Sequence, residues 1–441
     1  MDIDKIIQDD NYALNPFQNN STHKEPLIIE RGEGVWIYSI TGEKIMDAFS
    51  GMWNVNVGYG NKELAQAAYE QMVKIAYGSN FSGSSTLPQI QLAKKLSGYA
   101  YENLHHTFFT CGGSEANESA FKTAQYYWKQ KGKPSKYKFI CLENAYHGMT
   151  MAAASATGMS KFWNVFNTIP GFIHIPNPNQ YRYEGDIRQD ESVGRAAARA
   201  LEEAIIKEGA DNIAGFISEP IQGSGGGIIP PDDYFPAVRE ICNKYEILMI
   251  ADEVITGFGR TGEMFALNHW GVSPDIVTFA KGVTSGYLPL GGMQVTDEIN
   301  SVIENAPPES AWLHGYTYSG HAASCSVALK NIELIERNNL LDNVKLKERR
   351  FMAELKVLSK YECIGDIRGI GLLHTIEFVT DCESKGKNFQ LAGEVYNRCL
   401  KNGLRLRMLG NNISIAPPFI ISDNDVDYII NTLERSLKEC I

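Results

Sequence analysis

Residues 247–262 read ILMIADEVITGFGRTG, and the segment FAKGVTSG follows at residues 279–286. Both contain the end of a short apolar run of the kind that forms a buried strand, and Asp252 and Lys281 come where these runs end. Helix-length amphipathic stretches separate such runs along the chain. Three further runs lie upstream: HTFFT at 106–110, KYKFICL at 136–142 and AGFISE at 214–219. This alternation predicts an α/β fold in which helices cover a largely parallel sheet.

Open parallel sheets bind their ligands beyond the carboxyl ends of the strands, so five strand ends indicate one site. Taken singly, an Asp after a strand is usually a helix N-cap or loop residue, and a Lys there is usually a solvated surface charge. Together, Asp252 and Lys281 match the needs of pyridoxal-5'-phosphate (PLP). This cofactor requires a lysine for its Schiff base and a carboxylate opposite its pyridine nitrogen.

The two ends of the chain differ from this middle part. The segment GVWIYSITGEKIMDAF at 34–49 alternates like a hairpin, and the chain from residue 326 onward contains two long helices. We expect residues 1–60 and 326–441 to form one smaller α+β domain, with residues 61–325 as the large domain.

Composition excludes several classes of protein. The formal net charge of −11 and the lack of a clustered basic surface argue against a nucleic-acid ligand. Eight scattered cysteines show no zinc-ligand spacing, so no metal site is predicted, and free thiols fit a reducing compartment. The N-terminus lacks the pattern of a secretory signal, and no window approaches the roughly 18 apolar residues of a membrane span. We therefore expect a cytoplasmic protein that is not bound to a membrane.

At this point the sequence resembles the class III (omega) aminotransferases of PLP fold type I, over nearly the whole chain. The stretch from Leu248 to Gly262 is close to the family signature, and Lys281 follows Asp252 at the spacing the family shows. The resemblance is strongest to omega-amino acid/amine:pyruvate aminotransferases. It implies a seven-stranded, mostly parallel sheet in the large domain, PLP as the cofactor, and Lys281 and Asp252 as catalytic residues.

The resemblance also assigns residues to the phosphate and the ring. In FFTCGGSEANESAFK, Gly113 and Ser114 look like the phosphate-binding pair; without the family, an ordinary capped helix start would be the better reading. In ENAYHGMT, Tyr146 resembles the aromatic residue that stacks on the pyridine ring, while His147 shapes the turn. Val254 resembles the branched side chain on the opposite face of the ring.

Two loops complete the implied cofactor site. The glycine-rich segment ISEPIQGSGGG lacks both common nucleotide-binding motifs, so a nucleotide site is rejected. By resemblance, Glu219 lies near the PLP hydroxyl and Gln222 supports it. Thr317, in HGYTYSGHAAS, matches the Thr that reaches the PLP phosphate of the neighbouring subunit. The resemblance therefore implies a homodimer or a dimer of dimers with shared active sites.

Substrate residues follow from the same resemblance. Trp53 aligns with an aromatic wall of the substrate pocket, to which Phe81 and Tyr146 contribute. Arg407 matches the Arg that grips a substrate carboxylate, a task that suits its planar fork. Arg405 would share a face with Arg407 if both lay on one strand, so the choice between them stays open.

The resulting hypothesis is a transaminase that moves an amino group from an omega-amino acid or amine to a small oxo acid, pyruvate ahead of 2-oxoglutarate. A PLP-dependent aminomutase, racemase or epimerase, or decarboxylase on the same fold is the alternative. A cofactor-binding protein without turnover is a third possibility, which the Asp252 and Lys281 pair disfavours.

Overall fold

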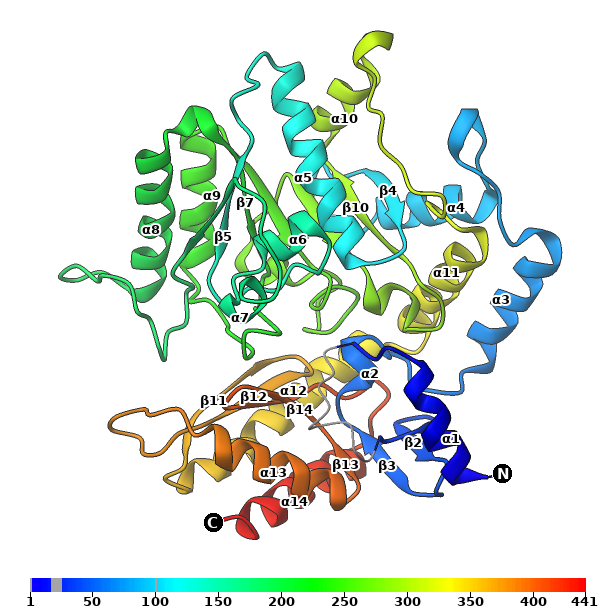
Figure 1. Ribbon diagram of the computed structural model, residues 1–441, viewed down its shortest axis with the longest axis vertical. Helices are drawn as coiled ribbons and strands as arrows, with labels where there is room; N and C mark the ends of the chain where they lie inside the picture. The colour runs from blue at the N-terminus through cyan, green and yellow to red at the C-terminus, as the bar shows by residue number, and fades with distance from the viewer. Residues whose placement is uncertain (1, 17–25, 100) are drawn as a thin grey trace.

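A seven-stranded sheet forms the upper part of the molecule in Figure 1. The computed structural model describes residues 2–16, 26–99 and 101–441. The strand order is β4-β10-β9-β8-β7-β5-β6, and β10 alone among these strands runs antiparallel to its neighbours. The bounds are His106–Thr110 (β4), Lys138–Leu142 (β5), Phe172–Ile175 (β6), Ile213–Ser218 (β7), Leu248–Asp252 (β8), Ile276–Phe279 (β9) and Gly291–Val295 (β10). The predicted α/β fold with a mostly parallel sheet is confirmed.

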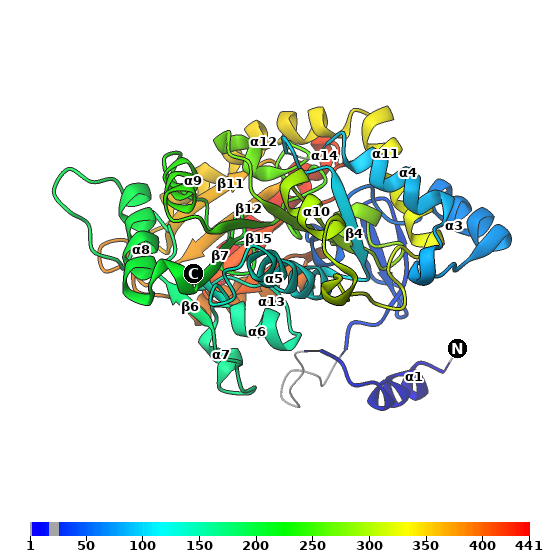
Figure 2. The same ribbon diagram turned by 90° about the horizontal axis from the view of Figure 1, so that it is seen from above.

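Helices cover both faces of this sheet. The chain moves outward from β4 to β5 to β6 and then back through β7 and β8. Because parallel crossovers are right-handed, the two directions place their helices on opposite faces. Figure 2 shows α5 and α6 on one side of the sheet and α9 on the other. The bounds are Gly113–Gln130 (α5), Met151–Ala156 (α6), Ser160–Trp163 (α7), Val193–Glu208 (α8), Tyr234–Lys244 (α9) and Asp297–Glu304 (α10).

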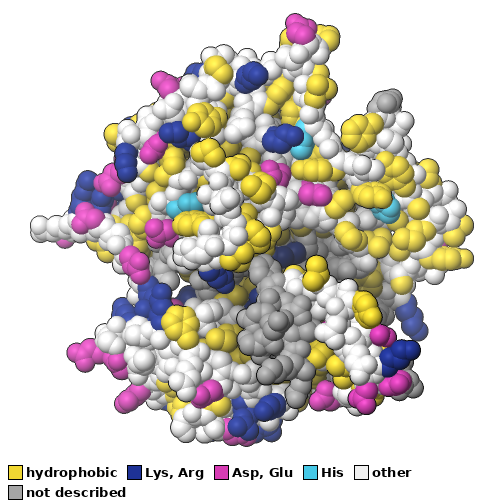
Figure 3. Space-filling view, viewed as in Figure 1, with side chains coloured by type: hydrophobic (Ala, Val, Ile, Leu, Met, Phe, Trp, Pro, Cys, Tyr) yellow, Lys and Arg dark blue, Asp and Glu magenta, His cyan; other side chains and the backbone are white. Residues whose placement is uncertain are grey.

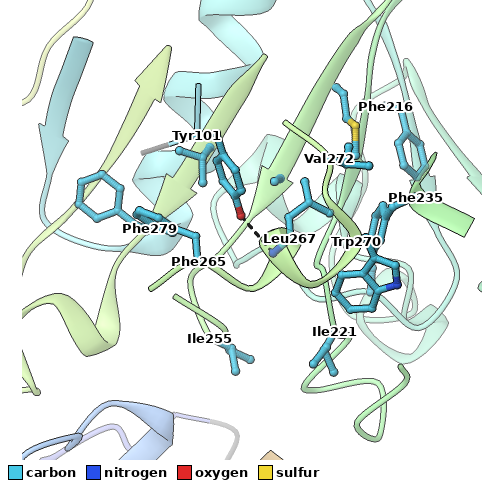
Figure 4. Close-up of a cluster of buried hydrophobic side chains, with 14 of the residues drawn as sticks. Tyr101, Phe216, Ile221, Phe235, Ile255, Phe265, Leu267, Trp270, Val272 and Phe279 are labelled. Atoms are coloured by element: carbon cyan, nitrogen blue, oxygen red, sulfur yellow. Dashed lines mark hydrogen bonds between the residues drawn. The ribbon is translucent and has the colours of Figure 1, made fainter. Parts of the chain in front are cut away.

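The main apolar core lies against the sheet and includes side chains from each of the strands β4 to β9; Figure 4 shows part of it. The Tyr101 hydroxyl accepts a hydrogen bond from the Leu267 backbone N–H at 3.1 Å and also contacts the buried Glu253 carboxylate. Glu253 accepts a second bond from Leu267 N–H at 3.0 Å. Burial raises the pKa of Glu253. These bonds fix the chain directly after Asp252, which is the last residue of β8.

Two four-stranded sheets form the lower part of Figure 1, and one of them joins both ends of the chain. Strands β1, β2 and β3 (Ile29–Glu33, Trp36–Ser39 and Lys44–Asp47) share a sheet with β13 (Leu404–Arg405). The other sheet has the order β11-β12-β15-β14, with bounds Ile364–Ile370, Leu373–Phe378, Asn412–Ile415 and Arg407–Leu409. Helices α12 (Leu340–Lys356), α13 (Phe389–Lys401) and α14 (Asp423–Lys438) pack with these sheets.

Five helices remain in the part of the chain that the structure describes. They are α1 (Ile3–Asp9), α2 (Ser50–Trp53), α3 (Lys62–Ile75), α4 (Leu87–Leu96) and α11 (Ala322–Arg337). Helix α11 packs against α3 and α4 and continues across the expected boundary at residue 325/326. The division into residues 1–60, 61–325 and 326–441 thus stays a prediction. Within the described residues, no helix is both long and apolar enough to cross a membrane.

All five strands predicted from apolar runs are present, but β10 has no such signal in the sequence. It begins Gly291-Gly292, and glycine is depleted in strands because it has no side chain to pack. Here the glycines serve close packing. A Cβ on Gly292 would lie 2.6 Å from the Phe108 carbonyl oxygen and 2.7 Å from Cζ of the Phe279 ring.

Gly292→Ala should therefore lower the free energy of unfolding by about 1 to 3 kcal/mol, since backbone or a buried ring must move. Urea unfolding followed by circular dichroism measures this change. Gly98→Ala is the control, because its Cβ would meet only the Lys95 carbonyl oxygen at 3.5 Å, an ordinary contact. Equal stability of the two variants would contradict the packing role of Gly292.

Candidate active site

A cavity of about 400 Å³ opens at the carboxyl ends of β4, β5, β7, β8 and β9. Its volume lies within the range of small-molecule sites, roughly 300 to 1,000 Å³. The structure brings eight of the predicted site residues together here: Gly113, Ser114, Tyr146, His147, Glu219, Asp252, Val254 and Lys281. The prediction that the strand ends converge on one site is thereby confirmed, while the role of each residue stays a prediction.

The Asp252 carboxylate is buried and held from three directions. Asn117 Nδ2 donates to Oδ2 at 2.8 Å, and the Val254 backbone N–H donates to Oδ1 at 3.0 Å. His147 Nδ1 lies 2.8 Å from Oδ2, so this nitrogen carries the proton and donates it. Burying a charge is unfavourable unless it is paired and hydrogen-bonded, and these bonds meet that need. These bonds therefore hold the Asp252 side chain in one orientation at the floor of the cavity.

Lys281 follows β9 and begins the short 3₁₀ turn η5 (Lys281–Thr284). Its backbone φ is +46°, a conformation that costs a non-glycine residue about 1 to 3 kcal/mol. Burial lowers the pKa of the Lys281 amine to about 8, although the Asp252 and Glu219 carboxylates act in the opposite direction. Near pH 8, about half of the amine groups are neutral and can act as nucleophiles or bases.

The N-terminus of α5 faces the same cavity. Gly112 caps this helix without a side-chain hydrogen bond, so the N–H groups of the first turn are free to bind an anion. Gly113 lets the Val254 side chain pack against the start of the helix, because a Cβ there would lie 2.8 Å from Val254 Cγ1. The Ser114 hydroxyl accepts from the Met149 N–H at 3.1 Å, which ties the turn to the loop after β5. This geometry suits a phosphate group.

Glu219 and Tyr146 form the wall beside Asp252. The Glu219 carboxylate accepts from the Tyr146 N–H at 2.9 Å and from the Gly223 N–H at 3.0 Å. Burial, together with the Asp252 charge, raises the pKa of Glu219 to about 7. Burial also raises the pKa of Tyr146, which stays protonated at neutral pH. Gln222 donates to the Glu143 carbonyl oxygen at 2.9 Å, so it braces the loop and does not contact Glu219 through this bond.

Trp53 and Arg407 are not among the residues that line this cavity. The Lys281 amine is 5.2 Å from the centre of the Trp53 ring, and the Trp53 ring meets Phe49 edge-on at 4.5 Å. The Arg407 guanidinium is 5.9 Å from the Phe49 ring and lines a second cavity of about 350 Å³. Figure 3 shows the front of the molecule hollowed between its upper and lower parts, with Lys and Arg side chains gathered along the hollow.

The expectation that Arg405 and Arg407 share a face of one strand is wrong. Arg405 belongs to β13 and Arg407 to β14, and these strands lie in different sheets. The chain passes from one sheet to the other at Leu406, which is buried. Arg405 forms an ion pair with the buried Asp47 at 3.9 Å. Arg407 has no ion pair or hydrogen bond with the described residues, and its buried Nε lacks a partner among them.

Phe81 and Thr317 lie away from the cavity within this chain. The Phe81 side chain is 51% exposed, and its ring lies close against Gly315, two residues before Thr317. Thr317 is exposed as well. The structure thus places these two predicted residues side by side on one surface but does not bring them to the other eight.

Asn117 organises the floor of the cavity and was not predicted from the sequence. Its amide donates to both Asp252 and the His147 carbonyl oxygen, at 2.8 and 2.7 Å, and its carbonyl accepts from the Thr278 hydroxyl at 2.7 Å. The available signal was a polar residue on the apolar face of α5, four residues after Gly113. Asn54, which also lines the cavity, was missed too.

Comparison with known proteins identifies the chemistry of this site. Residues 17–437 match the model of the family "aminotransferase class-III". The chain belongs to the class III aminotransferases. A putrescine–pyruvate aminotransferase from Pseudomonas aeruginosa is 39% identical over 97% of this chain and 94% of that protein. A tomato (Solanum lycopersicum) gamma-aminobutyrate transaminase is 38% identical over 95% of this chain and 82% of its own.

Solved structures of omega-transaminases superpose on almost the entire chain of this class III aminotransferase. An (S)-enantioselective enzyme from Thermomicrobium roseum has a TM-score of 0.96 and 41% identity, with 100% of this chain and 99% of that chain covered. An omega-transaminase from Pseudomonas jessenii in complex with PMP has a TM-score of 0.95 and 36% identity, with 99% and 97% covered. The predicted fold type I and family are confirmed.

PLP is the cofactor of this family, and the residues of the cavity fit it. The glycine-lined start of α5 accommodates a phosphate, the fixed Asp252 carboxylate suits a protonated pyridine nitrogen, and Lys281 supplies an amine of lowered pKa. His147 Nε2 is buried and has no hydrogen-bond partner among the described residues. The imidazole is therefore committed to Asp252 through Nδ1 alone.

Asp252→Asn should retain the cofactor but lower the single-turnover rate about a hundredfold or more, because an amide cannot keep the pyridine nitrogen protonated. Absorbance gives the PLP content, and stopped-flow spectroscopy gives the rate. Asp275→Asn is the control: this carboxylate accepts from the Met249 N–H at 2.7 Å, before β9, and should affect stability alone. A near-normal rate in Asp252→Asn would mean that Asp252 serves only as a hydrogen-bond acceptor that stabilises the fold.

Proposed function

We propose that this aminotransferase takes an amino group from an omega-amino acid or amine donor and gives it to a small oxo acid, with pyruvate ahead of 2-oxoglutarate. The observation that carries this proposal is the Lys281 and Asp252 pair in one cavity, with an aromatic path leading from Lys281 to the unpaired guanidinium of Arg407. The names of the relatives, a putrescine–pyruvate aminotransferase and several omega-transaminases, support this substrate class.

The residues divide the work as follows. Bound PLP supplies an electron sink for the carbon next to the amine. Lys281 would attach the cofactor covalently and would act as the base that takes the proton from the donor carbon. Asp252 would keep the ring nitrogen protonated. Gly113 and Ser114 at the start of α5 would hold the phosphate, and Tyr146 and Val254 would contact the ring.

Substrate selection is assigned to the wall beyond Lys281. Trp53 and Phe49 offer apolar surface next to the Lys281 amine, which suits the alkyl or aryl part of an amine. Arg407 has a guanidinium without a carboxylate partner in the described chain, and a substrate carboxylate would supply one. Arg405 is less suited to bind a substrate carboxylate, because it already forms an ion pair with Asp47.

We also propose a homodimer or a dimer of dimers with shared active sites. Phe81 and Thr317 share one exposed surface, and Leu313 and Tyr318 of the same segment are 90% and 57% exposed. Exposed apolar side chains grouped in this way mark interaction surfaces. On this proposal, Phe81 and Thr317 complete the neighbouring subunit's site. The cytoplasmic location stays a prediction.

The function is tested with the holoenzyme and a panel of donors, among them beta-alanine, taurine, a diamine and an arylalkylamine, against pyruvate and 2-oxoglutarate. Alanine should form faster than glutamate, and borohydride should fix the cofactor covalently on Lys281, located by peptide mass spectrometry. Lys281→Ala should lose turnover by several orders of magnitude. Full conversion of the bound cofactor to its pyridoxamine form by the donor alone, with release of a carbonyl product, separates transamination from isomerisation and decarboxylation on the same fold.

Arg407→Ala tests the carboxylate clamp. It should lower kcat/KM for pyruvate and for omega-amino acid donors roughly ten- to hundredfold, since a charge-assisted bond of about 1.5 to 3 kcal/mol is lost. The half-reaction of a neutral arylalkylamine, followed without any oxo acid, should be nearly unchanged. Arg405→Ala is the comparison: it leaves Asp47 buried without its cation and should affect both kinds of donor alike. Equal losses of activity with charged and with neutral donors in Arg407→Ala would mean that this residue supports the fold and does not bind the substrate carboxylate.

A further inference from the structure

The turn that carries Lys281 holds two residues in an unfavourable conformation. Lys281 has φ +46° and Ser285, which closes the turn, has φ +50°, so two non-glycine residues lie in the left-handed region. Such conformations persist only where the surroundings over-determine them. Hydrogen bonds from outside the turn must therefore hold the Lys281 backbone in place.

Asn331 on α11 supplies those bonds. Its Nδ2 donates to the carbonyl oxygens of Gly282 and Val283 at 2.9 and 3.0 Å, and its Oδ1 accepts from the Ser285 hydroxyl at 2.6 Å. The side chain is fully buried on a helix face made of Val327, Ala328, Ile332, Leu334 and Ile335. A buried amide on an apolar face is unfavourable unless it is satisfied, and Asn331 directs both its donors and its acceptor to this one turn.

The same bonds connect the turn with the wall of the substrate pocket. The Ser285 hydroxyl accepts from the Val57 N–H at 3.2 Å, and Val57 follows the loop that carries Trp53. On the other side, a Cβ on Gly282 would lie 2.5 Å from Asn56 Nδ2, so this loop closely brackets the turn. The side-chain oxygen Oδ1 of Asn56 in turn accepts from the buried Arg260 at 2.9 Å. Asn331 thus joins the turn and the wall into one unit.

We propose that Asn331 is a positioning residue that, with Ser285, fixes the Lys281 backbone so that its amine stands at the donor carbon. This inference rests on the proposed role of Lys281. It assigns to α11, which contributes no residue to the lining of the main cavity, the orientation of the group that moves the proton. A merely structural Asn331 would change stability without changing the behaviour of Lys281.

The test compares Asn331→Leu, which keeps the size of the side chain and removes its bonds, with Asn343→Leu. Asn343 is a matched control on α12: its Nδ2 also donates to two backbone carbonyls, of Phe419 and Ile421, at 2.6 and 3.2 Å. Four quantities are measured on each holoenzyme. They are the melting temperature, the single-turnover rate at saturating amine donor and the donor's apparent Kd, both from a series of donor concentrations, and the pH midpoint of the visible band, which reports protonation of the Lys281 linkage.

Asn331→Leu should slow the single-turnover rate about tenfold or more, because small misplacement of a reacting group is costly, while the donor's apparent Kd changes less than about twofold. The midpoint of the visible band should rise, since a loosened turn lets water reach the charged form. Asn343→Leu should lower the melting temperature and leave the rate and the midpoint unchanged. Equal effects of the two variants on the rate, or an unmoved midpoint in Asn331→Leu, would overturn the proposal.

Ser285→Ala keeps the inference testable if Asn331→Leu fails to fold. It retains the two bonds from Asn331 Nδ2 and removes the bond to Asn331 Oδ1 and the link to Val57, so it should slow the rate by a smaller factor and move the midpoint in the same direction. No change in either quantity would also overturn the proposal. Borohydride trapping on Lys281 in the unaltered enzyme is the separate check: if it labels another residue, the proposed function fails, whereas correct labelling with unresponsive variants rejects only the role of Asn331.

Discussion

The buried carboxylate of Asp252 is the constraint on which the site depends. A charge at that depth needs partners, and the chain supplies them from three elements: Asn117 from α5, His147 from the loop after β5, and the backbone of Val254 after β8. These bonds form only if the three elements are correctly positioned relative to one another. The hydrogen bonds of one carboxylate therefore also fix the position of the start of α5, where a phosphate would bind, and of the loop that carries Tyr146.

Strain at the opposite side of the cavity is handled in a similar way. Lys281 and Trp53 both have positive φ, at +46° and +57°, and both are held by polar groups buried outside the cavity. The loop around Trp53 is fixed by the buried Asp47 carboxylate, which accepts from the N–H groups of Phe49 and Gly51 at 3.1 and 2.6 Å. Buried polar groups thus keep two strained turns, and the side chains they present, in a single arrangement.

Most individual residues of the main cavity were assigned by the resemblance to the family. The sequence itself predicted five of the seven strands and the convergence of their ends on one site, because apolar runs that end in polar residues are a local signal. It was insufficient for β10, whose glycines are dictated by the neighbouring Phe108 backbone and Phe279 ring. Asn117 and Asn331 were missed because one polar residue on the apolar face of a helix is a weak local signal. The role of such an amide depends on partners far along the chain, such as Asp252 for Asn117. Where Phe81 and Thr317 act depends on a second subunit, which one chain cannot specify.

The two arginines show how tertiary structure decides between equivalent residues. In the sequence, Arg405 and Arg407 differ only by two positions. In the fold, the chain crosses from one sheet to another at the buried Leu406, so that Arg405 neutralises Asp47 and Arg407 turns to the ring of Phe49. A guanidinium is weakly hydrated and stacks on aromatic faces, which makes such a position tolerable without a carboxylate. A cation without an ion-pair partner among the described residues, beside an aromatic path to Lys281, is the arrangement that favours recognition of a substrate carboxylate at Arg407.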